Sequence, residues 1–262
     1  PNTGWTMAAL VSTMCGLPLK ALGLFAHNRL DAFERFLPNA RCLPEILRDN
    51  GYRTEFLQGA TLEFAAKDRF LEQHGFGLIE GKDEIEHREQ VGENGEDNWR
   101  IYDDTLIEIA KRHYEQLENA GRPFLLAMLT VDTHTEADTQ NASRYCRREH
   151  GESYEQLVEC TDEMIAGLVE WIQAHDRAHN TEIVVLGDHL VMFGNPKYNR
   201  TFKILDGLRD RTPFHLFVDP EGSGAVARTR EFTHFDLFPT MLTAAGFDIA
   251  GHRLGLGTDL FA

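Results

Sequence analysis

The sequence predicts an α/β protein with a mostly parallel central sheet covered by helices on both faces. Short apolar segments alternate along the chain with amphipathic segments, an order typical of a parallel or mixed sheet between two helical layers. The apolar segments have the density of Val, Leu, Ile and Phe expected of strands buried on both sides. With 262 residues, of which 42% are hydrophobic, the chain can form one large domain with its own core.

Four apolar segments are predicted strands. They are residues 53–57, 124–131, 182–186 and 213–218, the first of which is the weakest. Helices are predicted where apolar residues recur at spacings of three and four. They cover residues 7–14, 43–49, 102–119, 154–174 and 237–245. The polar stretches 82–98 and 136–153 are predicted surface loops that border a binding cleft.

The charge balance argues against a nucleic-acid partner. Asp and Glu number 42 against 26 Lys and Arg, and no basic stripe is interleaved with aromatic residues. No apolar run reaches the ~18 residues that a membrane-spanning helix needs, so we expect the chain itself to be a soluble domain. No signal peptide opens it either. The chain begins with Pro-Asn-Thr-Gly-Trp-Thr, a segment interpreted below as a candidate catalytic turn, so we expect the chain to begin inside a domain.

The four cysteines are Cys15, Cys42, Cys146 and Cys160. They do not form the paired C-x-x-C pattern of a zinc site, and an even number permits two disulfides in three pairings. A Cys146–Cys160 bridge would close a short polar loop, and a Cys15–Cys42 bridge would join the first two helices. Free buried thiols are equally compatible with the sequence.

The pair Asp188–His189 directly follows a predicted strand. In open α/β sheets, ligands bind beyond the carboxyl ends of strands, and this pair offers an oxygen and a nitrogen to one divalent ion. The alternative is a helix-capping Asp beside a solvent-facing His. A second histidine, His134, also follows a predicted strand, in a turn with Asp132 and Thr133. It could donate to an anionic substrate or protonate a leaving oxygen, or be an ordinary loop residue.

Thr6 ends the segment Pro-Asn-Thr-Gly-Trp-Thr, just before an apolar helix. A hydroxyl on the first turn of a helix lies among free backbone N–H groups, which favour the negative charge of a phosphate. Threonine is also a good N-cap, and the residues alone do not separate these two interpretations.

Six stretches together resemble the alkaline phosphatase/sulfatase superfamily. The resemblance is strongest to the phosphoglycerol transferases that modify periplasmic glucans, which are relatives of the lipoteichoic acid synthases. The stretches are residues 2–19, 42–76, 129–138, 160–172, 184–190 and 233–247, and they occur in the order of the family. The resemblance implies a single sulfatase-like catalytic domain over residues 1–262, truncated at its N-terminus so that one or more strands are missing.

The resemblance also assigns roles. Thr6, ten positions before Gly16, takes the place of the family's nucleophile, and together with Asp188 and His189 it would bind metal. His134 corresponds to a histidine near the transferred phosphate. Sulfatases have Cys or Ser at the nucleophile position and convert it to formylglycine. Because threonine cannot undergo that conversion, the resemblance disfavours sulfatase activity.

Two departures from the family pattern stand out. Lys67 occupies the place of an arginine that holds glycerol phosphate in lipoteichoic acid synthases, and Ala65 replaces an aromatic residue nearby. A lysine would pair with phosphate as a point charge, with less defined geometry than an arginine. The family's further glutamate ligand, which comes from a strand well before the nucleophile, has no counterpart here. We therefore expect weak or absent metal binding by this chain alone.

The function implied is metal-dependent transfer of phosphoglycerol from phosphatidylglycerol to a periplasmic glucan or another glycan, through a covalent threonine intermediate. Manganese is the expected metal, with zinc or magnesium as alternatives. The full-length protein would be membrane-anchored at the periplasmic face of the bacterial inner membrane, a setting that favours the two disulfides. Phosphoethanolamine transfer, phosphodiester hydrolysis and non-catalytic binding of a glycan or lipid headgroup remain as alternatives. His234 is interpreted as structural.

Overall fold

A computed structural model describes residues 4–20, 30, 34–89, 91, 99–134, 145–146, 153–190, 212–220 and 231–262. Its main helices are α1 (Thr6–Cys15), α2 (Leu43–Asp49), α3 (Lys67–Gln73), α4 (Lys82–Arg88), α5 (Asp103–Asn119), α7 (Tyr154–His175) and α9 (His234–Ala244). Its strands are β1 (Arg53–Gln58), β2 (Leu78–Glu80), β3 (Phe124–Leu129), β4 (Ile183–Leu186), β5 (His215–Val218), β6 (Arg253–Leu254) and β7 (Gly257–Thr258). Two short 3₁₀ turns are η2 (Phe64–Ala66) and η5 (Ala250–His252).

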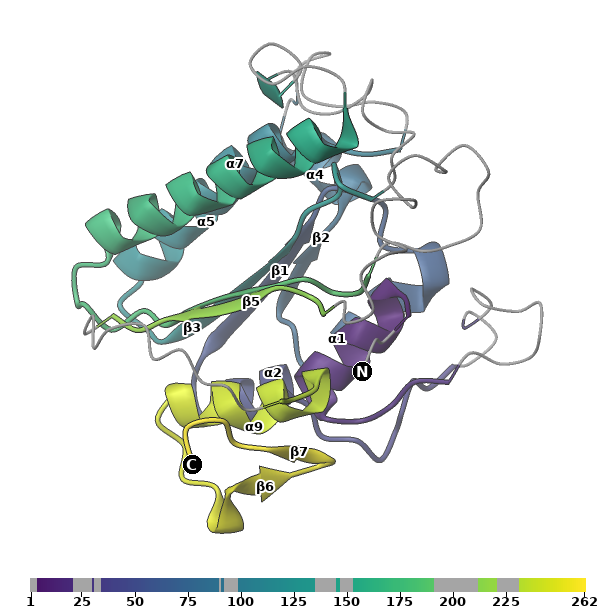
Figure 1. Ribbon diagram of the computed structural model, residues 1–262, viewed down its shortest axis with the longest axis vertical. Coiled ribbons are helices and arrows are strands. Elements are labelled where there is room, and N and C mark those ends of the chain that lie inside the picture. The colour runs from purple at the N-terminus through teal and green to yellow at the C-terminus, as the bar shows by residue number, and fades with distance from the viewer. Residues whose placement is uncertain are drawn as a thin grey trace.

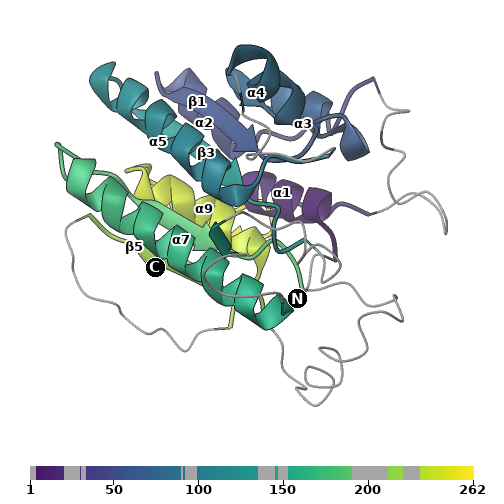
Figure 2. The same ribbon diagram turned by 90° about the horizontal axis from the view of Figure 1, so that it is seen from above.

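These elements form three layers, as Figure 1 shows. Helices α5 and α7 lie side by side on one face of the strands, and α1, α2 and α9 lie on the other. The view from above in Figure 2 places α3 and α4 at one side of the molecule and β5 at the other. The predicted class, an α/β fold with helices on both faces of the sheet, is confirmed.

The described strands form one parallel sheet and two antiparallel pairs. The parallel sheet has the strand order β2-β1-β3, with Phe56 of β1 opposite Ile79 on one side and Ala127 on the other. Strands β4 and β5 pair in antiparallel orientation, with Val184 opposite Phe217. Strands β6 and β7 form a small hairpin that packs against α9. Because β1 and β3 are parallel, the loops that follow them leave the sheet at the same edge.

Alternation along β1 builds a core on each face of the sheet. Phe56 points toward α1 and α2 and joins a cluster with Met7, Phe70 and Phe238, whereas its neighbour Leu57 joins Leu106 on the α5 side. Each of these side chains is at most 2% exposed. Burial of a side chain of this size contributes roughly 1.5–3 kcal/mol, so these clusters fix the helices against the sheet.

The expectation that the predicted strands are buried on both sides holds for β1 and is wrong for β3, β4 and β5. Side chains of β3 and β4 are only half-buried, and Phe214 and Leu216 at β5 are 61% and 40% exposed. Within the described part of the chain, β1 has a strand on each side, whereas β3 pairs with β1 alone and β4 with β5 alone. Within that part of the chain, β3, β4 and β5 therefore have a paired strand on one side only, and their side chains are less covered than those of β1.

The predicted loop at 82–98 is also wrong in its first part, since Lys82–Arg88 forms helix α4. The helix was not predicted because its sequence is mostly charged. Ile85 is its one fully buried apolar residue, and a single apolar residue gives no helical periodicity. The start is marked instead by a cap, in which the Gly81 N–H donates to the Glu84 carboxylate at 2.9 Å. Residues 92–98 and 135–144 lie outside the described residues.

Two disulfides join elements of the fold. Cys15 at the end of α1 is bonded to Cys42, which precedes α2, and Cys146 is bonded to Cys160 of α7. The sequence left the connectivity open, and the two bridges are the Cys15–Cys42 and Cys146–Cys160 pairs considered above. Among the described helices, none has both the length and the apolar composition needed to cross a bilayer.

Replacing Cys15 and Cys42 together by Ala should destabilise the domain. The bridge spans 27 residues, and the loss of such a cross-link lowers the free energy of unfolding by about 3.5 kcal/mol. Urea unfolding followed by circular dichroism measures the change. The matched control is the double Ala variant at Cys146 and Cys160, whose shorter span of 14 residues predicts a slightly smaller loss. Equal stability of the Cys15/Cys42 variant and wild type would contradict the prediction.

Candidate functional site

Thr6 is the first residue of helix α1. The turn before it contains Gly4, whose φ of +80° lies in the left-handed region that favours glycine, and Trp5 takes the N-cap position with extended backbone. The alternative that Thr6 caps the helix is therefore wrong. All residues of α1 after Thr6 are buried, so the positive end of the helix dipole emerges from the core next to the Thr6 hydroxyl.

Asp188 and His189 follow strand β4 directly. The Gly187 N–H donates to the Phe214 carbonyl at 2.7 Å, which continues the pairing toward β5 and fixes the backbone just before the pair. Nδ1 of His189 lies 2.8 Å from the carbonyl oxygen of Leu190. Since a carbonyl only accepts, Nδ1 carries a proton in this contact, which leaves Nε2 as the nitrogen that can bind a metal ion.

The Nε2 edge of the His189 ring faces Thr6 and Asp188. The Nε2 atom lies 3.4 Å from Thr6 Oγ1 and 3.3 Å from Asp188 Oδ2. The His189 side chain is 10% exposed and that of Asp188 is 31% exposed, so the group is largely buried but still reached by solvent. The contact joins residues 183 positions apart, which brings the start of α1 to the end of β4.

This group fits a divalent cation. A neutral imidazole nitrogen, a carboxylate oxygen and a hydroxyl oxygen are a donor set that Mn²⁺, Zn²⁺ and Mg²⁺ accept to different degrees. Nε2 of His189, Oδ2 of Asp188 and Oγ1 of Thr6 face one another closely enough for one ion to be bound by all three. The contact from Nδ1 to the Leu190 carbonyl is the kind of outer contact that orients a metal-binding histidine.

His234 of α9 holds the backbone just before the Asp188–His189 pair. It is the first residue of α9, is 7% exposed, and its Nε2 donates to the Gly187 carbonyl at 2.9 Å. Because Gly187 immediately precedes Asp188, His234 ties α9 to the backbone that carries the Asp188–His189 pair. The sequence indicated a structural role for His234 but gave no sign of this partner. A histidine just after a helix-capping Thr233 was the available signal.

His134 follows β3 in a turn, and its backbone N–H donates to the Val131 carbonyl at 3.0 Å. Its ring packs edge-on against Trp99, with 5.5 Å between the ring centroids. Gly59, which follows the parallel strand β1, allows close packing here, since a Cβ at this position would lie 2.8 Å from Val131 Cγ2. His134 thus lies beyond the carboxyl end of β3, and its participation in one site with Thr6 stays a prediction.

Lys67 is the first residue of α3 and is 6% exposed. Burial lowers the pKa of its ammonium group to about 8, although the neighbouring Asp68 opposes the shift. Its Nζ lies 5.3 Å from the ring centroid of the exposed Phe64. Ala65 and Ala66 before it have φ values of +61° and +56°, a left-handed conformation that costs non-glycine residues on the order of 1 kcal/mol each. A substrate-binding role for Lys67 likewise stays a prediction.

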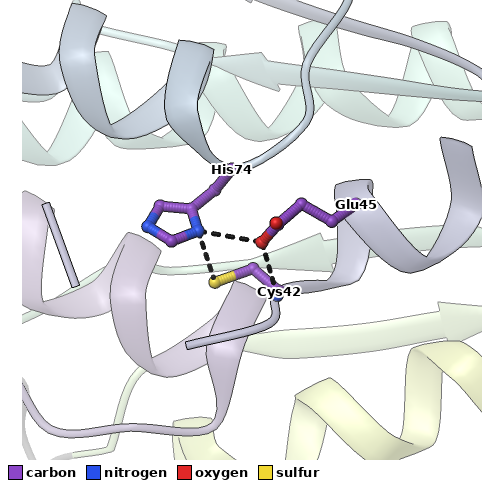
Figure 3. Close-up of side chains that lie close together, drawn as sticks. All are labelled: Cys42, Glu45 and His74. Carbon is purple, nitrogen blue, oxygen red and sulfur yellow. Dashed lines mark hydrogen bonds and ion pairs between the residues drawn. The ribbon is translucent and has the colours of Figure 1, made fainter. Parts of the chain in front are cut away.

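A second cluster has metal-like spacing but a structural role. Figure 3 shows Cys42, Glu45 and His74, whose ligand atoms lie within 4.8 Å of one another. The Cys42 sulfur is bonded to Cys15 and is therefore not a thiolate. His74 contacts Glu45 Oε2 at 2.9 Å through Nδ1 and the Phe36 carbonyl at 2.8 Å through Nε2. These contacts join the segments around α2 and α3, and we assign no metal to the cluster.

A family model described as Sulfatase matches residues 3–247. The chain belongs to the sulfatase family. Phosphoglycerol transferase I of Xanthomonas euvesicatoria is 36% identical to this sulfatase-family chain over 201 residues, covering 73% of the chain and 28% of the relative. Phosphoglycerol transferase I of Citrobacter koseri is 37% identical over 196 residues, covering 73% and 25%. The chain thus spans about a quarter of the length of these curated relatives.

Solved structures share the fold of this sulfatase-family chain. The lipoteichoic acid synthase LtaP from Listeria monocytogenes superposes with a TM-score of 0.67 at 16% identity, over 97% of this chain and 63% of the other. A protein in the alkaline phosphatase superfamily from Vibrio parahaemolyticus superposes with a TM-score of 0.68 at 17% identity, over 98% and 58%. At these identities the likeness concerns the fold, and it confirms the predicted superfamily architecture.

Proposed function

We propose that the protein containing this domain transfers phosphoglycerol from phosphatidylglycerol to a glycan, with a periplasmic glucan as the first candidate acceptor. The observation that carries the proposal is the approach of Thr6 Oγ1 to His189 Nε2, beside Asp188, at the start of a buried helix. The relatives named phosphoglycerol transferase I support the choice of the transferred group. The proposal includes one catalytic domain over residues 1–262 and membrane anchoring at the periplasmic face of the inner membrane.

The ligand set belongs to the same proposal. Thr6, Asp188 and His189 would hold a divalent ion, Mn²⁺ in the first place and Zn²⁺ or Mg²⁺ as alternatives, and a glutamate outside residues 1–262 would complete the site. When bound, the ion lowers the pKa of the nucleophilic hydroxyl and offsets charge on the phosphoryl oxygens. The fit rests on the position of His189 Nε2, which lies within 3.4 Å of both Thr6 Oγ1 and Asp188 Oδ2 while Nδ1 is held by the Leu190 carbonyl.

The reaction has two steps. In the first, the Thr6 hydroxyl gives its proton to solvent and Oγ1 attacks the phosphorus of the donor. The bond from phosphorus to the diacylglycerol oxygen breaks, and a phosphoglycerol ester of Thr6 forms. His134 supplies the proton that the departing diacylglycerol oxygen takes up. In the second, an acceptor hydroxyl gives its proton to His134 and attacks the same phosphorus. The bond from phosphorus to Thr6 Oγ1 breaks, and Thr6 takes up a proton from solvent to regain its hydroxyl. Lys67 would bind the donor phosphate as a point charge.

Trapping the covalent intermediate tests the proposal. Full-length protein incubated with labelled phosphatidylglycerol but no glycan should carry phosphoglycerol on Thr6, as identified by peptide mass spectrometry. Phosphatidylethanolamine in place of the donor separates phosphoethanolamine transfer, and release of free glycerol phosphate separates hydrolysis. Phosphoglycerol on a different residue, or a protein that takes up no label while it transfers, would overturn the threonine mechanism. Binding of glycan without any turnover of donor would support a non-catalytic module instead.

The pKa of Lys67 predicts an alkaline limit to donor binding. As the pH rises through about 8, the ammonium group loses its charge and its pairing with the donor phosphate, so KM for phosphatidylglycerol should rise above that pH. Lys67→Arg keeps its charge and should remove this pH dependence, because the guanidinium does not titrate in this range. KM measured at intervals between about pH 7 and about pH 9 checks both variants. The same alkaline rise in Lys67→Arg would contradict the role of Lys67.

A further inference from the structure

A buried carboxylate anchors the turn that carries His134. Asp103 is the first residue of α5, and its two carboxylate oxygens accept the N–H groups of Val131 at 2.7 Å and Asp132 at 3.0 Å. The Asp132 carboxylate in return accepts the Asp103 N–H at 3.4 Å. Asp103 and Asp132 are both fully buried. The start of α5 and the end of β3 are thus joined by three hydrogen bonds through two side chains.

The same turn fixes the position of His134. The His134 N–H donates to the carbonyl of Val131, whose own N–H is held by Asp103. Tyr154 of α7 donates through its hydroxyl to the Thr133 carbonyl at 3.0 Å. The His134 ring then meets Trp99 at the edge of the sheet. Releasing the Asp103 contacts would free the backbone on which the imidazole is carried.

The charges around Asp103 make this anchor sensitive to protonation. Arg100 is fully buried, with Nε 3.9 Å from Asp132 Oδ1, so one guanidinium serves two buried carboxylates. Burial raises the pKa of Asp103 to about 6, and the negative charge of Asp104 adds to this rise. The rise is opposed by the hydrogen bonds from the Val131 and Asp132 N–H groups and by the positive charge of Arg100. The ionised carboxylate accepts both N–H groups through two charged oxygens, whereas protonation turns one oxygen into a hydroxyl donor and weakens it as an acceptor. The ionised form of Asp103 therefore holds the turn more firmly.

We propose that Asp103 is a positioning residue for His134, whose imidazole it sets in place by holding the turn at residues 131–134 through its two backbone hydrogen bonds. This inference rests on the proposed function, in which His134 gives a proton to the departing diacylglycerol oxygen. Asp103 touches neither substrate nor reacting atoms and acts through the backbone alone.

The protonated form of Asp103 favours the stability of the fold, whereas the ionised form favours the positioning of His134. Its folded-state pKa lies above the ordinary value of 3.8, so the protonated form favours the folded state at low pH, and that contribution is lost as the pH rises through about 6. Asp103→Asn mimics the neutral form and should therefore keep or raise the unfolding midpoint above pH 6. It should loosen the turn at the same time, because the amide offers one acceptor where the carboxylate offers two.

Hydrogen exchange in the full-length protein tests the anchor without substrate. At about pH 7.5, the backbone amides of residues 131–134 should exchange at least roughly tenfold faster in Asp103→Asn than in wild type, as expected for the loss of hydrogen bonds to a charged group. At about pH 5, where Asp103 is protonated in wild type, the two proteins should exchange alike. Asp104→Asn is the matched control, since the Asp104 carboxylate accepts the N–H of its neighbour Thr105 at 2.7 Å.

Kinetics give the second readout. Asp103→Asn should lower kcat for transfer by roughly a hundredfold, the low end of what a general acid supplies, with little change in KM. The acidic limb of the wild-type pH profile near pH 6 should disappear. Unchanged exchange at residues 131–134, or a fall in kcat that accompanies a fall in the unfolding midpoint, would overturn the proposal. If the amides of residues 131–134 exchange faster in Asp103→Asn as expected, but wild-type protein transfers no phosphoglycerol, the proposed function is overturned and the anchoring contact is still supported.

Discussion

Thr6→Ala should abolish phosphoglycerol transfer by the full-length protein. Removing a covalent nucleophile lowers kcat by a factor on the order of 10⁴ or more, because no second group can form the ester intermediate. The change removes a hydroxyl and a methyl group at the first residue of α1, where Trp5 and not Thr6 is the N-cap. The fold should therefore remain intact, with an unfolding midpoint close to that of wild type. Transfer of labelled glycerol phosphate to a glucan measures the loss.

Thr6→Ser is the matched control for this prediction. It keeps the hydroxyl 3.4 Å from His189 Nε2 and removes only the methyl group, so it should retain measurable transfer and form the same intermediate. Thr6→Val has nearly the shape of threonine without the hydroxyl and should be as inactive as Thr6→Ala. Activity in the Val variant would show that Thr6 contributes shape rather than the attacking oxygen, which would overturn its assignment as nucleophile.

The sequence predicted most elements of the fold because local signals marked their ends. Pro44 and Gly51 bracket α2, which has the predicted bounds Leu43–Asp49. Apolar periodicity located α5 and α7 to within one residue at each end. Helix α4 was missed because one buried residue, Ile85, cannot generate a period. The burial of β3 and β4 was overestimated because a strand's neighbours are set by the tertiary fold.

The candidate site was predicted only as far as local sequence signals reach. Asp188 and His134 follow apolar strands, and the rule that ligands bind beyond the carboxyl ends of strands applies to each in isolation. The contact between Thr6 and His189 joins residues that are 183 positions apart in the sequence, and no local pattern predicts it. The hydrogen bond from His234 to Gly187 and the bonds of Asp103 to the turn after β3 are equally non-local. A buried polar side chain can be recognised as important only once its partner is known.

Loss of the divalent ion should have the second largest effect. A chelator should remove transfer activity from the full-length protein, and Mn²⁺ should restore it, since the ion is proposed to activate the nucleophile and offset phosphoryl charge. His189→Ala removes the imidazole nitrogen that faces both Thr6 and Asp188, and it should lower kcat by roughly a thousandfold without recovery in added Mn²⁺.

Binding measurements separate this role from a purely structural one. Titration calorimetry should show Mn²⁺ binding to full-length wild type, much weaker binding to His189→Ala, and weak binding to the 262-residue chain alone. His74→Ala is the matched control, because His74 lies in a cluster with metal-like spacing whose sulfur is held in a disulfide. That variant should lose stability and keep its Mn²⁺ affinity. Manganese binding that survives in His189→Ala but fails in His74→Ala would place the ion at the Cys42–Glu45–His74 cluster and remove the metal from the proposed mechanism.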